Sequence, residues 1–411
     1  MHGMKRLAES LLREYLGLFP CVAILGPRQC GKTTLMRQLG ADWRYFDLEK
    51  GGDLSVISHD PDLFLRLNPS RIALDEAQIV PALFPALRVA IDADRSTPGR
   101  FVITGSSSPA LQKSISESLA GRIAMIELSP LMWSEVEGGT VSPLIRHIAA
   151  AETDPEGLLK DLAPRAPLSR AVDYWFRGGY PEPWLKNQPR FTERWTDQYI
   201  QTYVMRDVAR LFPGLDSTRF QLFIRMLGGL SGRILNFADV ARALGVTQPT
   251  ARDYFAIAHG TFLWRTLPAF HRSALKRVVK HPRGHLRDTG LLHQLLRLPD
   301  SETLLRHPQC GSSWQGLVTE EILRQFSILG TAVEGYHYRT SAGAEVDLVC
   351  EGPFGLIPFE IKFGQRVDPR DLRPIRDFIQ EYQCPLGFVI NTDEQPRRYD
   401  DRLLGVPFHY L

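Results

Sequence analysis

The sequence predicts an α/β protein of several domains, and three observations carry this prediction. The chain has 411 residues, of which 44% are hydrophobic, so it is too long for one hydrophobic core and apolar enough to fold throughout. Between residues 21 and 131, short apolar runs alternate with helical patterns, as they do around a buried parallel sheet. Near the C-terminus, an alternating run around Val346 precedes a second strand-like run around Phe359.

The apolar runs of the first region have the length of strands, and each ends at turn-forming or polar residues. They lie at residues 21–25, 43–48, 72–74, 101–103 and 124–126. We expect them to form the parallel sheet of a first domain, which spans residues 1–140.

Three further domains are expected after this sheet. Helical periodicity interrupted by prolines predicts a helical lid over residues 141–215. Residues 216–297 show the order of a winged helix: helix, glycine turn, helix and strand. Residues 298–411 begin with a helix and continue with strands around Val346, Phe359 and Phe388, so a second sheet is expected there.

Charge and cysteine usage exclude several classes of protein. The 49 basic and 46 acidic residues give a net charge of +3, so any contact with nucleic acid must come from a local patch. The five cysteines show no CxxC spacing, which argues against a disulfide framework and against a zinc site. No run reaches the roughly 18 to 20 apolar residues of a membrane span. We therefore expect a cytoplasmic protein with no membrane partner.

Residues 26–33 carry the strongest motif, because they match GxxxxGK[ST] between an apolar strand and a helical run. The glycines let backbone N–H groups surround phosphates, Lys32 neutralises the β and γ oxygens, and the Thr33 hydroxyl is a ligand for Mg²⁺. A chance glycine-rich turn is the alternative, and the flanking strand and helix disfavour it. The expected nucleotide-binding residues are Gly26, Pro27, Arg28, Gln29, Cys30, Gly31, Lys32, Thr33 and Thr34.

Two more strands end in polar residues that suit nucleotide hydrolysis. The run at 72–74 leads into Asp75 and Glu76, where Asp75 would hold Mg²⁺ through water and Glu76 would polarise the attacking water. Thr104 ends another run, where it would orient that water or sense the γ-phosphate, with a simple turn or helix cap as the alternative. The sequence has no Asn-Lys-x-Asp signature, so ATP is favoured over GTP.

Arg122 is a candidate for an arginine that contacts the γ-phosphate. It follows Leu119-Ala120-Gly121, shortly after the strand that ends at Thr104. The guanidinium could act within its own chain or across a subunit interface, and the second case would require a homo-oligomer. The alternative is an ordinary surface arginine.

Residues 237–258 predict a helix-turn-helix. The first helix would turn Val240, Ala243 and Leu244 inward, and Gly245 would lead to the second helix. Residues 261–265 would form the wing strand. The outward-facing residues of the second helix would be Gln248, Thr250 and Arg252.

A basic stretch follows the helix-turn-helix. Residues 265–287 contain no acidic residue and seven basic ones, which are Arg265, Arg272, Lys276, Arg277, Lys280, Arg283 and Arg287. In a nearly neutral protein such a cationic patch favours contact with nucleic-acid phosphates, in a salt-dependent manner. A solvated strip or a protein-docking wing is the alternative. We expect DNA, branched or duplex, as the partner.

The last domain places carboxylates and a lysine on neighbouring strands. Residues 344–349 and 357–362 read as a hairpin in which Glu360 and Lys362 share a face. If Asp347 lies beside them, two carboxylates can bind a divalent metal while the lysine orients or activates water, as hydrolysis of a phosphodiester requires. Glu320, on a preceding helix, could add a metal ligand. The alternatives are a solvated helix residue for Glu320, and a charged edge strand or a decayed site for Asp347, Glu360 and Lys362.

The order of these motifs resembles the prokaryotic AAA+-type ATPases that carry a DUF4143 C-terminal region, over nearly the whole chain. The resemblance implies an AAA+-like ATPase core with a helical lid, a winged helix, and a C-terminal fold similar to PD-(D/E)xK nucleases and archaeal junction resolvases. The motifs are residues 26–33, 74–78, 104–106, 119–122, 178–182, 288–291, 345–347 and 360–362.

The likeness also implies roles for the C-terminal residues. Asp347, Glu360 and Lys362 fall on the nuclease motif, and Glu320 falls on the helix carboxylate that such resolvases use. We expect an ATP-driven motor that remodels or migrates four-way-junction DNA. The alternatives are an ATP-licensed, metal-dependent DNA nuclease, and a nucleotide-gated signalling or scaffold switch whose nuclease-like domain is inert.

Overall fold

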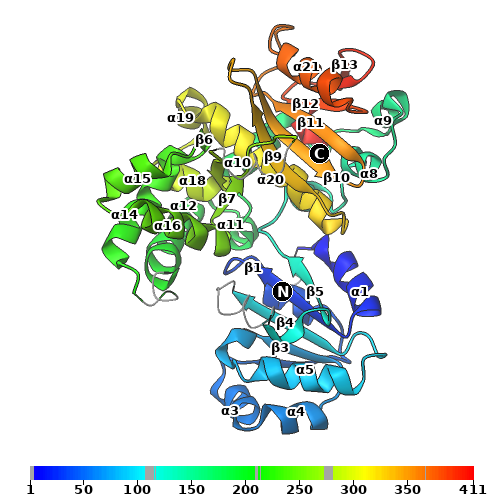
Figure 1. Cartoon of the computed structure of the whole chain (residues 1–411), viewed down its shortest axis with the longest axis vertical. Coiled ribbons are helices and arrows are strands. Elements are labelled where there is room, and N and C mark those ends of the chain that lie inside the picture. The colour runs from blue at the N-terminus through cyan, green and yellow to red at the C-terminus, as the bar shows by residue number, and fades with distance from the viewer. Residues whose placement is uncertain are drawn as a thin grey trace. The chain divides into compact units, whose positions relative to one another are not determined.

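The computed structural model describes residues 4–106, 115, 117–208, 212, 214–272, 281–365 and 367–411. The chain forms two compact units (Figure 1). The first comprises Met1–Leu131, Tyr180–Glu182 and Gly260–Phe262, and the second comprises Met132–Gly179, Pro183–His259 and Leu263–Leu411. No helix within the described ranges is both long enough and apolar enough to span a membrane.

The first unit contains a five-stranded parallel sheet with the order β2-β3-β4-β1-β5, so the prediction of a parallel α/β core is confirmed. Every residue of β1 is buried, which explains why its sequence is continuously apolar rather than alternating. The strands are β1 (Cys21–Gly26), β2 (Arg44–Asp47), β3 (Ile72–Asp75), β4 (Phe101–Ser106) and β5 (Ile123–Glu127).

Short helices surround this sheet, drawn in blue and cyan in Figure 1. Buried side chains of α4 and α5, among them Phe64 and Leu87, belong to the same core as Ile72 and Ile103 of the sheet. The helical elements are α1 (Ala8–Leu18), α2 (Lys32–Arg37), α3 (Gly51–His59), α4 (Pro61–Leu67), the 3₁₀ turn η1 (Ala77–Ile79) and α5 (Leu83–Ala93).

The second unit begins with a mainly helical region, as the periodicity predicts. Several of its helices start at proline, which has no N–H to leave unpaired in a first turn. The elements are α7 (Trp133–Glu137), α8 (Pro143–Ala149), α9 (Pro155–Asp161), α10 (Leu168–Arg177), α11 (Pro181–Lys186), α12 (Pro189–Tyr199), the π-helix η2 (Ile200–Asp207) and α14 (Ser217–Leu230).

Two helices and a small antiparallel sheet follow α14. The helices are α15 (Phe237–Leu244) and α16 (Gln248–Gly260), and Gly245 between them has a positive φ of 61°. The sheet has the order β6-β8-β7, with β6 (Arg233–Ile234), β7 (Trp264–Leu267) and β8 (Arg283–Leu286). The strand expected at 261–265 thus begins at Trp264. Ala241 is buried and Ala243 is exposed, so Ala243 does not face inward as expected.

The motifs at residues 178–182 and 288–291 meet where α10 ends and α18 (Thr289–Leu295) begins. The Asp288 carboxylate accepts hydrogen bonds from the N–H groups of Gly179, at 2.8 Å, and Leu291, at 3.0 Å. A Cβ on Gly178 would lie 2.4 Å from Asp288 Oδ1, and one on Gly290 would lie 2.2 Å from the carbonyl oxygen of Arg177. Glycine is therefore needed at both positions because the two segments approach so closely.

The C-terminal region forms a separate six-stranded sheet with the order β13-β14-β12-β11-β10-β9. The predicted hairpin is present, since β10 and β11 pair in antiparallel register with Leu348 opposite Phe359. The strands are β9 (Glu334–Arg339), β10 (Glu345–Gly352), β11 (Gly355–Ile361), β12 (Gly387–Asn391), β13 (Arg397–Arg398) and β14 (Leu403–Pro407), and the helical elements are α19 (Ser301–Arg306), α20 (Cys310–Ile328), α21 (Arg373–Tyr382) and η3 (Phe408–Tyr410).

Candidate nucleotide site and C-terminal carboxylate site

The loop at residues 26–33 connects β1 to α2 and has the backbone shape that its glycines permit. Gly31 has a φ of 104°, which is the left-handed region, and it immediately precedes α2. A Cβ on Gly26 would lie 2.1 Å from the carbonyl oxygen of Leu128. The Lys32 ammonium donates to the carbonyl oxygens of Gly26, at 3.1 Å, and Pro27, at 2.9 Å, so it lies across the loop that would surround phosphates.

The other expected residues of the loop differ in environment. Cys30 is fully buried, and burial raises the pKa of its thiol, so it is not a reactive thiolate. Arg28 is exposed, and its Nη2 atom lies 3.6 Å from Glu49 Oε1. Gln29 and Thr34 are also exposed, and Gln29 has a positive φ of 63°.

Asp75 accepts hydrogen bonds from three side chains of the nucleotide site. The hydroxyls of Thr33 and Tyr45 donate to its Oδ2 at 2.7 Å and 2.6 Å, and the Thr104 hydroxyl donates to its Oδ1. The order of the strands explains this meeting, because β4 lies between β1 and β3 and all three have their carboxyl ends at the same edge. Thr33, Asp75 and Thr104 are therefore brought together, as the sequence predicts, while Tyr45 of β2 was missed because a lone tyrosine in a strand pattern carries no signal.

Glu76 follows Asp75 with a φ of 54°, which turns the chain out of β3 into η1. Its N–H donates to the Thr104 hydroxyl at 3.3 Å, and its carboxylate accepts a hydrogen bond from the Gln78 amide. Glu76 and Asp75 thus both contact Thr104, one through the backbone and the other through its side chain.

Arg6 is a second residue that sequence reasoning missed. It is 4% exposed, and its guanidinium donates to the carbonyl oxygens of Cys30, at 2.6 Å, and Ser129, at 2.7 Å. A buried cation therefore links the phosphate-binding loop to the segment after β5. An arginine near the N-terminus, outside any motif, gives no indication of this role.

The structure corrects the interpretation of Arg122 as a γ-phosphate arginine within its own chain. Its guanidinium forms a two-pronged ion pair with Asp92 of α5, at 2.8 and 2.9 Å, which lowers the pKa of Asp92 to about 2. Arg122 precedes Ile123, which pairs with Cys21 at the start of β1. The phosphate-binding loop follows the other end of β1, about 16 Å away at roughly 3.3 Å per residue.

The residues at the carboxyl edge of the sheet fit a magnesium nucleotide. Hydroxyl and carboxylate oxygens are the ligands that Mg²⁺ prefers, and Thr33 and Asp75 provide one of each within hydrogen-bonding distance. The Lys32 ammonium adds a cation that contacts the loop carbonyls of Gly26 and Pro27. This donor set is what the phosphates of ATP and an accompanying Mg²⁺ require.

The second site lies in the C-terminal sheet and is centred on Asp347 of β10. Its Oδ2 accepts a hydrogen bond from the N–H of Ile361 at 2.9 Å. Its Oδ1 accepts from the Gln315 amide at 3.0 Å and lies 3.3 Å from the Arg283 guanidinium. Burial raises the pKa of Asp347, and Arg283 offsets only part of that effect.

Glu360 and Lys362 complete this site from β11 and the residue after it. The Lys362 ammonium lies 2.8 Å from Glu360 Oε1, whereas the buried Oε2 has no hydrogen-bond partner. Burial, together with the charge of Asp347, raises the pKa of Glu360 to about 8. Asp347, Glu360 and Lys362 therefore form one cluster, as the hairpin register predicts.

Glu320 lies elsewhere, which does not fit the expected role as a metal ligand. It is 2% exposed, and its carboxylate contacts three guanidinium groups and an imidazole. Burial alone would raise the pKa of Glu320, but the arginines outweigh burial and hold it well below its usual range. The groups around it are Arg265, His285, Arg287 and Arg324. On α20 it is Gln315, not Glu320, that reaches Asp347.

The same contacts correct the interpretation of the basic stretch. Arg265 and Arg287 bind Glu320, and Arg283 binds Asp347 and Glu345, so these three guanidinium groups point into the protein. They are not available to a nucleic-acid backbone. Arg272 is exposed, whereas Lys276, Arg277 and Lys280 lie outside the described residues. Among the described residues, no group of three or more His, Cys, Asp or Glu side chains is arranged to hold a metal.

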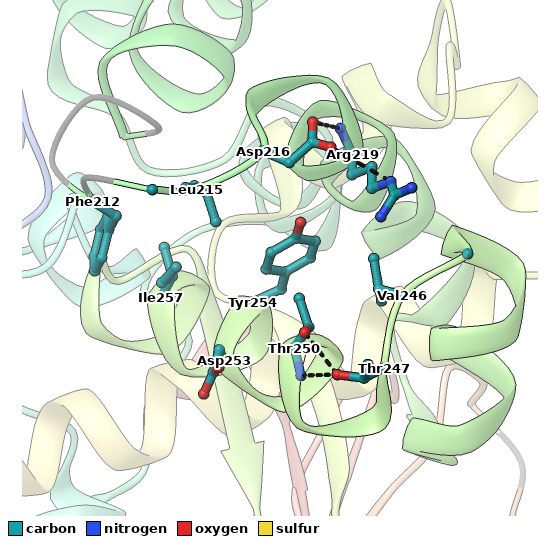
Figure 2. Close-up of a pocket in the computed structure, with 12 residues that line it drawn as sticks. Phe212, Leu215, Asp216, Arg219, Val246, Thr247, Thr250, Asp253, Tyr254 and Ile257 are labelled. Carbon is teal, nitrogen blue, oxygen red and sulfur yellow. Dashed lines mark hydrogen bonds and ion pairs between the residues drawn. The ribbon is translucent and has the colours of Figure 1, made fainter.

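A groove of about 520 Å³ adjoins the turn before α16 (Figure 2). Asp216 caps α14 by accepting from the N–H of Arg219 at 3.1 Å, and the exposed carboxylate of Asp253 also lines the groove. The Thr250 hydroxyl bonds that of Thr247 at 2.8 Å, so Thr250 is half-buried instead of facing outward. Arg219, which pairs with Asp216 at 3.5 Å, and apolar side chains such as Val246 and Ile257 complete the lining.

The parallel sheet, the loop after β1 and the acidic pair at the end of β3 define the first unit as an AAA-type P-loop ATPase fold. A family model described as "AAA domain" matches residues 19–137. Two further models, both of domains of unknown function, match residues 169–302 (DUF8612) and 310–411 (DUF4143). The chain belongs to the family of AAA-domain proteins that carry a C-terminal DUF4143 region, which confirms the resemblance seen in the sequence.

Two relatives match nearly the whole chain. The chain is 34% identical over 408 residues to the uncharacterized proteins Mb2031c of Mycobacterium bovis and Rv2008c of Mycobacterium tuberculosis, a match that covers 98% of this chain and 83% of each relative. Among solved structures, it is similar to the Walker-type ATPase PABY2304 of Pyrococcus abyssi. That similarity has a TM-score of 0.44 and 14% identity, and it covers 70% of this chain and 94% of that one.

Proposed function

We propose that the chain hydrolyses ATP and couples hydrolysis to the remodelling or migration of branched DNA. The convergence of Lys32, Thr33, Asp75 and Thr104 at one edge of the sheet, with Glu76 beside them, carries the hydrolysis part. These residue types bind a magnesium nucleotide and place a carboxylate within reach of water.

Each residue of the nucleotide site has a distinct part in this proposal. Lys32 leaves the loop carbonyls and pairs with the β and γ phosphates, while Thr33 and Asp75 hold Mg²⁺, which neutralises phosphate charge when bound. Glu76 accepts the proton of the attacking water. Thr104, which contacts both Asp75 and the Glu76 backbone, keeps the two acids in a fixed relation.

Contact with DNA is assigned to the helices α14 to α16 and the sheet of β6 to β8, interpreted as a winged helix. Support comes from the order of these elements and from the exposed Gln248 and Arg252 on α16. Arg252 lies over the Phe237 ring at 4.4 Å, which orients its guanidinium without an acidic partner in the described residues. Arg272, also exposed, would add one phosphate contact.

The test is the rate of ATP hydrolysis with a four-way junction, duplex or single strand added. We expect the junction to give the strongest stimulation, and we expect salt to weaken it because phosphate contacts release counterions. Lys32→Ala should abolish hydrolysis. Arg252→Ala should reduce stimulation, whereas Arg242→Ala should not, because Arg242 pairs with Asp239 at 3.0 Å. If no DNA stimulates hydrolysis and none binds in a salt-sensitive manner, the DNA part of the proposal is wrong.

A metal-dependent nuclease is the second candidate function, and one observation favours it. The Oε2 atom of Glu360 is buried without a hydrogen-bond partner beside Asp347. An orphaned carboxylate oxygen of this kind fits a divalent cation shared by the two acids. Lys362 would orient water or stabilise the developing charge on the phosphate.

A homo-oligomer belongs to the proposal only through Arg122. At its position beside the start of β5 it could reach a nucleotide held by another subunit, but not the one in its own chain. Such a contact requires that the ion pair with Asp92 opens.

A further inference from the structure

Arg283 reaches the carboxylate site from a different sheet. It is the first residue of β8, and its side chain is 11% exposed. One guanidinium nitrogen lies 3.3 Å from Asp347 Oδ1, and another lies 2.7 Å from Glu345 Oε2. A single buried cation therefore bridges two acids of β10.

Asp347 has little capacity left for another ligand. Its Oδ2 accepts from the Ile361 N–H, and its Oδ1 is shared by Gln315 and Arg283. Glu360 next to it still has a free oxygen, although it is 5% exposed. The cluster thus has one acid occupied by an arginine and one acid that lacks a partner.

Charge explains why an arginine and a divalent cation exclude each other here. Both are positive, both need Asp347 Oδ1, and two cations within a few ångströms in a buried site repel strongly. The neighbouring Arg339 differs, because it pairs with Glu345 alone, at 3.1 Å, and its side chain is 49% exposed. Of the two arginines, Arg283 is the one that contacts Asp347 Oδ1, the oxygen that a metal bound between Asp347 and Glu360 would use, and it shares this oxygen with the neutral Gln315 amide.

We propose that Arg283 competes with a divalent cation for Asp347, so that the Asp347–Glu360 site binds the cation only when the guanidinium withdraws. The inference rests on the second candidate function. Because β8 belongs to the same small sheet as β7, next to the proposed DNA-contacting helices, a displacement of β8 by a few ångströms would open the site.

The test is titration of the full chain with Mn²⁺, read by the paramagnetic resonance of the free ion. All proteins carry Asp75→Asn, which removes the carboxylate ligand of the nucleotide site. We expect Arg283→Gln to bind Mn²⁺ at least about tenfold more tightly than the parent, because a charge-assisted competitor is lost. Arg339→Gln is the matched control and should bind like the parent. Adding Asp347→Asn to Arg283→Gln should remove the gain.

The outcomes separate the inference from the function on which it rests. Equal Mn²⁺ affinity in the parent and in Arg283→Gln would be consistent with the metal site but would refute competition by Arg283. Weaker Mn²⁺ binding in Arg283→Gln would mean that Arg283 helps to bind the cation, which also refutes competition. If no variant binds Mn²⁺ through Asp347, the metal site itself is wrong. Should Arg283→Gln not fold, Arg283→Lys, which keeps the charge but loses the fork of donors, should give an intermediate affinity.

Discussion

At the scale of single residues, the two sites differ in how their acids are neutralised. Asp75 accepts three hydroxyl hydrogen bonds, which stabilise a carboxylate without adding positive charge. Asp347 instead faces the Arg283 guanidinium, and Glu320, outside both sites, faces three guanidinium groups. Hydroxyl groups around Asp75 leave the carboxylate charge available to a bound cation. A guanidinium group beside Asp347 already balances that charge.

Glu320→Gln tests the pairing of an acid with guanidinium groups. The substitution leaves Arg265, Arg287 and Arg324 without their common anion, and loss of one partner of a buried ion pair costs about 3 to 5 kcal/mol. We expect urea denaturation at pH 7 to show a loss of that size. Glu302→Gln, at an exposed position of α19, should change stability by less than about 0.5 kcal/mol.

The pH dependence of the same pair of proteins gives an independent check. The pKa of Glu320 is depressed in the folded state, so its contribution is complete above the unfolded value of about 4.3 and is lost as pH falls toward the folded value. The difference between wild type and Glu320→Gln should therefore be constant from pH 7 to about 5 and shrink below pH 4. A difference that instead disappears between pH 7 and 5 would contradict this assignment.

Residues within a local motif could be predicted from the sequence, and residues joined by the fold could not. Lys32 and Thr33 adjoin their glycines, and Asp75 directly follows an apolar strand, so spacing alone places them. The ion pair of Arg122 with Asp92 of α5 joins residues 30 positions apart, and spacing does not give it. Arg324 lies on the same helix as Glu320, but the other partners come from β7, from β8 and from Arg287 just after β8, up to 55 residues away in the chain.

At the scale of elements, the junction between α10 and α18 explains two glycine motifs that the sequence does not connect. Gly178 and Gly290 lie 112 positions apart. A Cβ on Gly178 would nevertheless meet the Asp288 side chain, and a Cβ on Gly290 would meet the Arg177 backbone. Periodicity predicts both helices but says nothing about their approach. The pattern of α15 also did not determine which alanine is buried. Either Ala241 or Ala243 could face the core, and in the structure Ala241 is buried and Ala243 is exposed.

Gly290→Ala tests this junction. A Cβ there would lie 2.2 Å from the Arg177 carbonyl oxygen, so α18 has to shift, at a cost of about 1 to 3 kcal/mol. Gly311→Ala is the control, because Gly311 also lies in a helix but has no atom within 4 Å of its Cβ position. Alanine should stabilise that helix by about 0.5 to 1 kcal/mol. Thermal melts that move in the same direction for both variants would argue against a close contact at Gly290.

At the scale of the whole molecule, the chain consists of two units with separate hydrophobic cores. A hydrophobic cluster of the first unit includes Leu74, Leu87 and Ile103, and a cluster of the second unit includes Val346 and Phe378. The proposed nucleotide site lies entirely in the first unit, and the carboxylate site lies entirely in the second. The two sites are therefore built on different cores.

Calorimetry of the full chain tests this division. We expect two unfolding transitions, of which only one rises in temperature when a non-hydrolysable ATP analogue and Mg²⁺ are added. At a hundredfold excess over its dissociation constant, a ligand stabilises the unit that binds it by about 2.7 kcal/mol. Lys32→Ala should remove the shift. A single transition, or an equal shift of both, would mean that the units unfold together.

Arg6 has a consequence for how a change at the loop spreads. Its one guanidinium holds Cys30, inside the loop, and Ser129, two residues before the chain leaves the first unit at Leu131. A guanidinium is planar and rigid, so the distance between these two carbonyl oxygens is fixed as long as both hydrogen bonds persist. If the loop rearranges, either one of these hydrogen bonds breaks or the segment that contains Ser129 moves with the loop.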